Sequence, residues 1–230
     1  QRRRLKVSVG PENYPAPDPE RLTLYGSFTS SSSFKPMMFL ALSGLAFDFR
    51  TVNLKLGWQF EPVYRQQVNR YGKVPVLQHQ GLTIVDSNVI LDYLARVTGI
   101  FLPATEQLQW QAREWLAWEA ANITNVAKVR HYHRFRAVDP AVMEYYVPQA
   151  EAAIGFVDQS LEGRDWLVGD ALSVADLGCW GRMVFMAEGG LEIERWPNVC
   201  RWSDAIKAMP GYDYPYDLIP KKDRRFSARA

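Results

Sequence analysis

The chain has 230 residues, 47% of them hydrophobic and 13% aromatic, so it is long and apolar enough to fold around a substantial core. Its net charge of +2 is too small to indicate a nucleic-acid-binding protein. No apolar run approaches the roughly 20 residues that a membrane span needs, so no contact with a membrane is expected.

The two cysteines, Cys179 and Cys200, lie in apolar helical contexts, without a CxxC motif and without zinc-ligand spacing. They are interpreted as buried free thiols in a reducing compartment, and the basic N-terminus lacks the apolar segment of a signal peptide. A cytoplasmic location is therefore expected. His131 and His133 are two residues apart and would face different directions on a helix, so no metal site is expected.

Residues 1–20 are rich in proline and are interpreted as an N-terminal extension. After them, alternating strand and helix signals predict a small α/β domain over residues 21–99. A Gly in a left-handed cap is expected to end its first helix at residue 44. The predicted strands are 22–26, 47–54, 74–79 and 82–85, and the predicted helices are 34–42, 61–70 and 87–99.

The pattern changes beyond a linker at residues 100–105, where strand signals give way to long helices over residues 106–220. One continuous helix is predicted from 106 to about 135 and another from about 140 to 161. The segment LSVADL opens a further helix with a capping box, in which Ser173 caps and Asp176 reaches back. A last helix ends before Pro210 and Gly211, and the basic run at 221–230 is interpreted as a solvated tail.

The segment SFTSSSSF lies between the first predicted strand and the first predicted helix. Ser33 is interpreted as the N-cap, because Pro36 then falls in the first turn, where backbone N–H groups have no intrahelical partner. The N-terminus of a helix favours a negative charge, so a serine hydroxyl here is well placed to stabilise an anion. Alternatively, these serines are only turn and capping residues.

Five motifs, in this order and spacing, resemble the cytosolic glutathione transferase family: LYGSFTSSSSFKPMMFLALSGL, GKVPVL, VDSNVILDYLA, LSVADL and WPNVCRW. The serine segment is similar to the SSCSW segment of the zeta class. The resemblance implies a thioredoxin-like α/β N-terminal domain, an all-α C-terminal domain and a homodimer. It also implies that glutathione is the co-substrate, that a hydrophobic electrophile is the second substrate, and that no metal takes part.

The resemblance implies that Ser30 is the catalytic donor to the glutathione thiolate, with Ser31 as its rival. It further implies a cis bond between Val74 and Pro75, whose turn exposes backbone to the peptide. Asp86 and Ser87 look like the pair that holds the γ-glutamyl group, and Lys55 and Lys73 could reach the glycyl carboxylate. Candidates for the second-substrate pocket are Ser32, at the zeta-class Cys position, Tyr132, His133, Phe135, Trp110, Trp115 and Trp118.

Two functions stay open from the sequence: a glutathione transferase that detoxifies electrophiles, and a non-catalytic interaction or regulatory protein with the same fold. The joint presence of Ser30, Pro75, Asp86 and Ser87 favours the enzyme. A thiol–disulfide oxidoreductase of the glutaredoxin type is disfavoured, because a serine stands where such a protein has its cysteine. A serine hydrolase is disfavoured because no GxSxG motif occurs.

Overall fold

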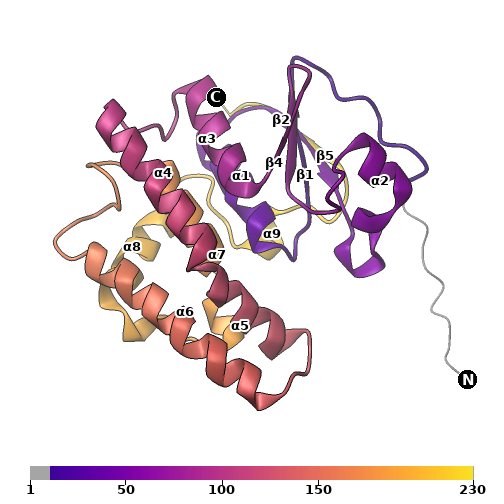
Figure 1. Cartoon of the computed structure of the whole chain (residues 1–230). Helices are drawn as coiled ribbons and strands as arrows, with labels where there is room; N and C mark the ends of the chain where they lie inside the picture. Colours follow the sequence, from indigo (N-terminus) through magenta and orange to yellow (C-terminus); the bar gives the residue numbers. More distant parts are fainter. Residues whose placement is uncertain (1–10, 230) are drawn as a thin grey trace, which may run out of the picture.

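The structure of the chain is a computed structural model that describes residues 11–229. An α/β portion is followed by a helical portion, as predicted (Figure 1). The strands are β1 (Leu22–Gly26), β2 (Phe47–Thr51), β3 (Val76–His79), β4 (Leu82–Val85) and β5 (Arg224–Phe226). The α-helices are α1 (Ser31–Ser43), α2 (Pro62–Gln67), α3 (Ser87–Thr98), α4 (Glu106–Ala121), α5 (Thr124–Arg134), α6 (Pro140–Ser160), α7 (Val174–Met183), α8 (Pro197–Lys207) and α9 (Pro215–Leu218).

The strands form a single mixed sheet in the order β4-β3-β1-β2-β5. β1 and β2 are parallel and are joined through α1, because a parallel pair needs a crossover connection. The other pairs are antiparallel. All five residues of β1 are buried, which suits a strand at the centre of a sheet covered on both faces.

The two faces of the sheet pack against different cores. Most helices lie on one side of the strands, and α2 lies on the other (Figure 1). A small cluster around Tyr25, Tyr64 and Val76 forms the α2 side. The ring of Tyr14 packs edge-on against Tyr25 at 5.6 Å and Tyr64 at 5.7 Å. The part of the predicted extension around Tyr14 therefore completes the α2 face of the sheet.

The helix predicted to be continuous from 106 to 135 is in fact two helices, α4 and α5, and that prediction was wrong. The break follows Asn122, whose side-chain amide donates to the carbonyl of Trp118 at 2.9 Å, as its own backbone N–H also does. Asn side chains compete in this way for backbone groups that a continuing helix would use. The capping box of Ser173 and Asp176 is confirmed.

A buried ionic network joins the α/β portion to the helices. Lys35 on α1 and Glu119 on α4 are both 0% exposed, with Nζ 2.5 Å from Oε2. Arg182 on α7 contacts the other oxygen of Glu119 at 2.8 Å, and Asn88 on α3 bonds both Lys35 and Glu119. Burial would raise the pKa of Glu119, but Lys35 and Arg182 hold it below its ordinary value. Burial also lowers the pKa of Lys35 to about 8.

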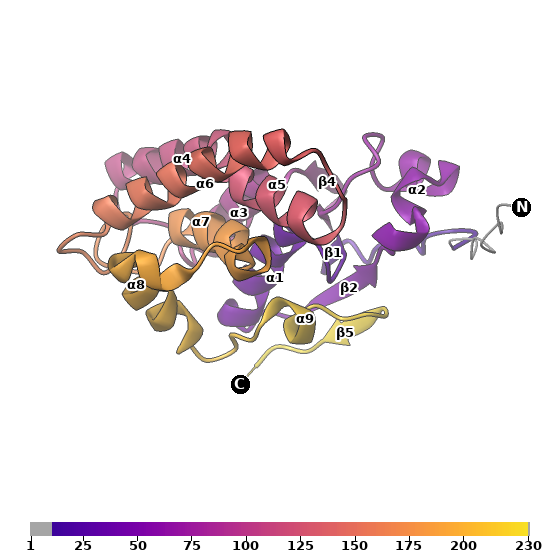
Figure 2. The ribbon, with the colours of Figure 1, turned by 90° about the horizontal axis from the view of Figure 1, so that it is seen from below.

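The C-terminal segment returns to the sheet, whereas the sequence predicted a solvated tail. β5 pairs antiparallel with β2 and runs beside it (Figure 2). The ring of Phe226 stacks on that of Phe47 at 4.4 Å, and Arg225 makes two hydrogen bonds to the carboxylate of Asp48. Arg225, one of the basic residues that suggested a solvated tail, therefore binds this segment to the sheet through Asp48.

We predict that Asp48→Asn lowers Tm by a few degrees at neutral pH. Hydrogen bonds from Arg225, together with Arg21, hold the pKa of Asp48 below its ordinary 3.8. A depressed carboxyl pKa stabilises the fold above the unfolded-state pKa, and this stabilisation is lost as pH falls through the folded-state value. In thermal unfolding, the difference in Tm between the variant and the wild type should therefore shrink as the pH falls below about 4. Asp204→Asn, which removes an exposed pair with Lys207, is the control and should leave Tm nearly unchanged.

A second prediction concerns the buried network. Glu119→Gln leaves Lys35 and Arg182 without their shared counter-charge, and should lower the free energy of unfolding by about 3–5 kcal/mol in urea titrations. Glu12→Gln, at an exposed carboxylate ahead of β1, should change it by less than about 0.5 kcal/mol. Equal effects of the two substitutions would show that the network does not anchor the two portions to each other.

Candidate functional site

The segments that carry the predicted site residues meet at one edge of the sheet. Gly26 at the end of β1 pairs with Thr51 at the end of β2. Tyr25 pairs with Val76 at the start of β3, and Val76 pairs with Val85 at the end of β4. The segments just beyond these residues, 27–31, 52–55, 73–75 and 86–87, therefore leave the sheet at the same edge. The register of the four strands therefore brings segments that are distant in sequence to the same edge of the sheet.

The turn between β1 and α1 is capped by Ser30, and the prediction that Ser33 is the N-cap was wrong. The hydroxyl of Ser30 accepts a hydrogen bond from the N–H of Ser33 at 3.1 Å. The hydroxyl of Ser33 instead accepts from the N–H of Ser27 at 3.2 Å, which closes the turn. Pro36 consequently lies in the second turn of α1, where it removes the N–H that would bond the carbonyl of Ser32.

The remaining serines have separate environments. Ser31 is only 6% exposed and lines a cavity together with Ser30. The hydroxyl of Ser32 accepts a hydrogen bond from Arg182 at 2.9 Å and does not line that cavity. As the cap of α1, the Ser30 hydroxyl acts only as an acceptor, through an oxygen lone pair. Its O–H proton therefore remains available for donation into the cavity.

The cavity over the serine turn has a volume of about 550 Å³, within the range of small-molecule sites. It is bounded by the serine turn, the 3₁₀ helix Leu54–Leu56 and α5. Its lining residues are Thr29, Ser30, Ser31, Leu54, Lys55, Ala127, Arg130, His131 and Phe135. None of these residues is acidic, and Lys55 and Arg130 carry positive charge, so the cavity suits an anionic ligand with an apolar part.

Of the three pocket candidates predicted in this region, Phe135 lines the cavity and the other two do not. Tyr132 and His133 do not line it: the ring of Tyr132 stacks on Tyr146, and Nδ1 of His133 lies 2.9 Å from the carbonyl oxygen of Glu188. The residues that do line it are Ala127, Arg130, His131 and Phe135. Spacings of three and four residues place these side chains on one helix face, and this periodicity was the available signal in the sequence.

The bond between Val74 and Pro75 is cis, as predicted. The segment before this bond is held in place from the α2 side of the sheet, because the carbonyl of Lys73 accepts hydrogen bonds from Tyr64 at 2.7 Å and from Asn69 at 2.9 Å. The side chain of Lys73 is exposed, and Val74 is half-buried two residues before Val76, the first paired residue of β3.

Asp86 is the N-cap of α3, and Ser87 is the first residue of that helix. Its Oδ1 accepts from the N–H of Asn88 at 2.8 Å and from that of Val89 at 3.4 Å. Asp86 has a φ of 77°, a strained conformation for a residue other than glycine, and such strain persists where the surroundings impose it. Ser87 is 4% exposed in the first turn of α3. A carboxylate and a helix N-terminus therefore lie side by side at this edge.

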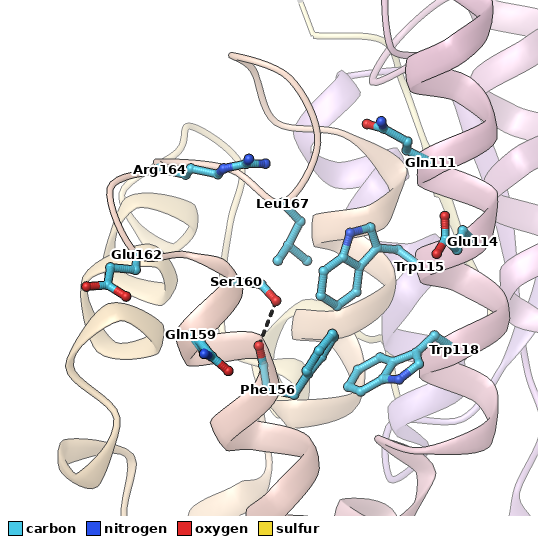
Figure 3. Close-up of a pocket in the computed structure, with 10 residues that line it drawn as sticks. All are labelled: Gln111, Glu114, Trp115, Trp118, Phe156, Gln159, Ser160, Glu162, Arg164 and Leu167. Carbon is cyan, nitrogen blue, oxygen red and sulfur yellow. Dashed lines mark hydrogen bonds between the residues drawn. The ribbon is translucent and has the colours of Figure 1, made fainter.

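A second cavity of about 720 Å³ lies between α4 and α6. Trp115 and Trp118 project from α4 toward Phe156 on α6 (Figure 3), and the ring centroids of Trp118 and Phe156 are 4.8 Å apart. None of its lining residues belongs to the serine turn or to the other segments at the sheet edge. Trp115 and Trp118, considered above as substrate-pocket candidates, belong to this second cavity.

Within residues 11–229, no group of three or more His, Cys, Asp or Glu side chains is arranged to hold a metal ion. No helix in the same part of the chain is both long and apolar enough to cross a membrane.

Comparison with protein families gives two matches that together cover most of the chain. Residues 20–96 match the family described as glutathione S-transferase, N-terminal domain. Residues 120–210 match the family described as glutathione S-transferase, C-terminal domain.

Curated proteins and solved structures give consistent results. The disulfide-bond oxidoreductase YfcG of Escherichia coli (strain K12) is 25% identical, over 76% of this chain and 86% of its own length. Glutathione S-transferase theta-1 of Rattus norvegicus is 25% identical, over 84% of this chain and 85% of its own length. A glutathione transferase from Burkholderia graminis, solved with two glutathione molecules bound per subunit, is 28% identical with a TM-score of 0.80, covering 90% of this chain and 91% of that one.

Proposed function

Because the chain belongs to the glutathione S-transferase family, we propose that it binds glutathione over the serine turn and stabilises the thiolate with a serine hydroxyl. The thiolate then attacks a hydrophobic electrophile in the adjoining cavity. The observation that carries the proposal is the position of Ser30, whose hydroxyl caps α1 while the residue borders the cavity.

The groups at the sheet edge match the polar groups of glutathione. The N-terminus of α3 with Ser87 would hold the γ-glutamyl carboxylate, and Asp86 would meet the ammonium group. The backbone of Val74, ahead of the cis Pro75, would pair with the cysteinyl part. Lys55 would bind the glycyl carboxylate in preference to Lys73, because Lys55 borders the cavity and Lys73 does not.

The energetics of the serine turn suit this task. A free thiol of the cysteine type has a pKa of about 8.5, and lowering it by about 2 requires about 2.7 kcal/mol of preference for the anion. One hydrogen bond to a charged group contributes about 1.5–3 kcal/mol. The N-terminus of α1 adds about 0.3–1 kcal/mol. The sum of these two contributions spans the required value of about 2.7 kcal/mol.

The second substrate would lie against Leu54, Ala127 and Phe135, the apolar part of the cavity lining. These side chains favour a hydrophobic electrophile, as expected for detoxification by conjugation. Dehalogenation, isomerisation and peroxide reduction would begin with the same attack by the thiolate.

Disulfide reduction is a second candidate, favoured by the name of the relative from Escherichia coli. Cys179 is fully buried and burial raises the pKa of its thiol well above the ordinary value, so it is not a nucleophile. The reaction would instead use the thiolate of bound glutathione, which attacks one sulfur of a disulfide and expels the other as a thiolate. Parallel assays with a disulfide and a carbon electrophile would separate the two reactions.

We further propose that the protein is a cytoplasmic homodimer. Both cysteines are free, as in a reducing compartment. On α4 and α6, Trp110 is 60%, Tyr145 64% and Phe156 48% exposed, and Phe156 lines the second cavity. The rings of Trp115, Trp118 and Phe156 contact one another there, and a second copy of this chain is the proposed occupant of this face, since an exposed apolar cluster marks an interface.

We predict that Ser30→Ala lowers kcat/KM for conjugation by about 10–100-fold, which corresponds to the loss of about 1.5–3 kcal/mol. The rising limb of the pH profile should move to higher pH, because the thiolate loses its donor. Conjugation assays with one carbon electrophile, run over a range of pH values, measure both effects.

Ser31→Ala is the matched control for that substitution, and Ser32→Ala tests the serine bound to Arg182. A larger loss of kcat/KM in Ser31→Ala than in Ser30→Ala would show that Ser31, and not Ser30, is the donor. Retention of the wild type on immobilised glutathione tests the binding step separately. A protein that neither binds glutathione nor conjugates would support the non-catalytic alternative.

For the dimer, Phe156→Arg should convert the wild-type dimer to a monomer at micromolar concentration, because a charge would be buried in an apolar interface. Light scattering after gel filtration measures the mass. Tyr214→Arg, at an exposed aromatic residue of the C-terminal segment, should leave the dimer intact. A monomeric wild type would contradict the proposal.

A further inference from the structure

Arg130 on α5 connects the helical portion to the serine turn. Its NH1 donates to the carbonyl of Thr29 at 3.1 Å, the residue immediately before Ser30. Its Nε donates to Glu188 at 2.7 Å, and its side chain is only 6% exposed. The guanidinium lies over the ring of Phe185, 3.6 Å from the centroid. These two hydrogen bonds and the contact with the ring face fix the position of the Arg130 side chain.

Tyr216, on α9, completes the cluster from the C-terminal segment. Its hydroxyl accepts from NH2 of Arg130 at 2.9 Å and donates to Glu188 at 3.2 Å. Burial raises the pKa of Tyr216, so the hydroxyl keeps its proton at neutral pH and can donate. Glu188 is also paired with Arg134 at 2.5 Å, so a single carboxylate serves two arginines.

The contact with Thr29 acts on the geometry of the proposed donor. Within the serine turn, the N–H of Ser30 donates to the carbonyl of Ser27 and the N–H of Ser33 donates to the hydroxyl of Ser30, while Arg182 on α7 holds Ser32. None of these bonds comes from α5, so the direction of the turn relative to that helix depends on a further contact. The bond from Arg130 supplies such a contact across the cavity that both segments line.

We infer that Tyr216 and Glu188 are positioning residues: by holding Arg130 against the carbonyl of Thr29, they aim the Ser30 hydroxyl at the sulfur of glutathione. The inference rests on the proposed function. It means that the C-terminal segment, which is docked on β2 through β5, completes the site, and that its contribution is made through Arg130 and not by contact with substrate.

The test compares Tyr216→Phe with Tyr214→Phe. Both tyrosines pack on Phe185, and the hydroxyl of Tyr216 bonds to Arg130 and Glu188. Tyr216→Phe should lower kcat/KM by about three-fold and raise the apparent pKa of its pH profile by about 0.5, the equivalent shift. Tyr214→Phe should change neither. Equal pH profiles for the two variants would overturn the inference.

A second measurement does not depend on activity. Amide hydrogen exchange over residues 27–34 should be about three-fold faster in Tyr216→Phe and in Glu188→Gln than in the wild type and in Tyr214→Phe. Unchanged exchange in both variants would overturn the positioning role even in an active enzyme. Faster exchange without a shift of the pH profile would overturn its link to the thiolate. Failure of the wild type to bind glutathione would instead count against the proposed function.

Discussion

The buried contact among Lys35, Glu119 and Arg182 is the constraint on which the rest of the structure depends. It lies where α1 meets α4 and α7, and two charges that are 0% exposed cannot separate without leaving one of them unpaired in the core. The network therefore fixes α1 relative to the helical portion. Since the serine turn is the start of α1 and the cavity opens between that turn and α5, this contact holds one wall of the site in place.

The four consecutive serines perform distinct structural tasks because each faces a different neighbour. Ser30 caps α1, Ser31 lines the cavity, Ser32 bonds Arg182 of the buried network, and Ser33 bonds the end of β1. The segment thus links the cap, the cavity and the anchor between the two portions. A proposed donor at Ser30 acts from a turn that is held on several sides, and preorganisation of this kind is what electrostatic stabilisation of an anion requires.

Local patterns in the sequence predicted the features that local chemistry controls. Strand and helix order and the capping box at Ser173 follow from short motifs, and the resemblance to the family implied the cis bond at Pro75. Contacts between distant segments were not predictable. The bond from Arg182 to Ser32, the docking of β5 on β2 and the cluster at Arg130 each depend on partners that only the folded chain brings together. The identity of the α1 cap also escaped prediction, because several adjacent serines could each have capped the helix.

The central claim is that the serine turn lowers the pKa of the thiol of bound glutathione. Titration of the ultraviolet absorbance of the thiolate, in the complex of the wild-type protein with glutathione, tests it most directly. The account predicts an apparent pKa about 2 below the value of about 8.5 for a free thiol. A bound thiol that titrates with the pKa of free glutathione would contradict it.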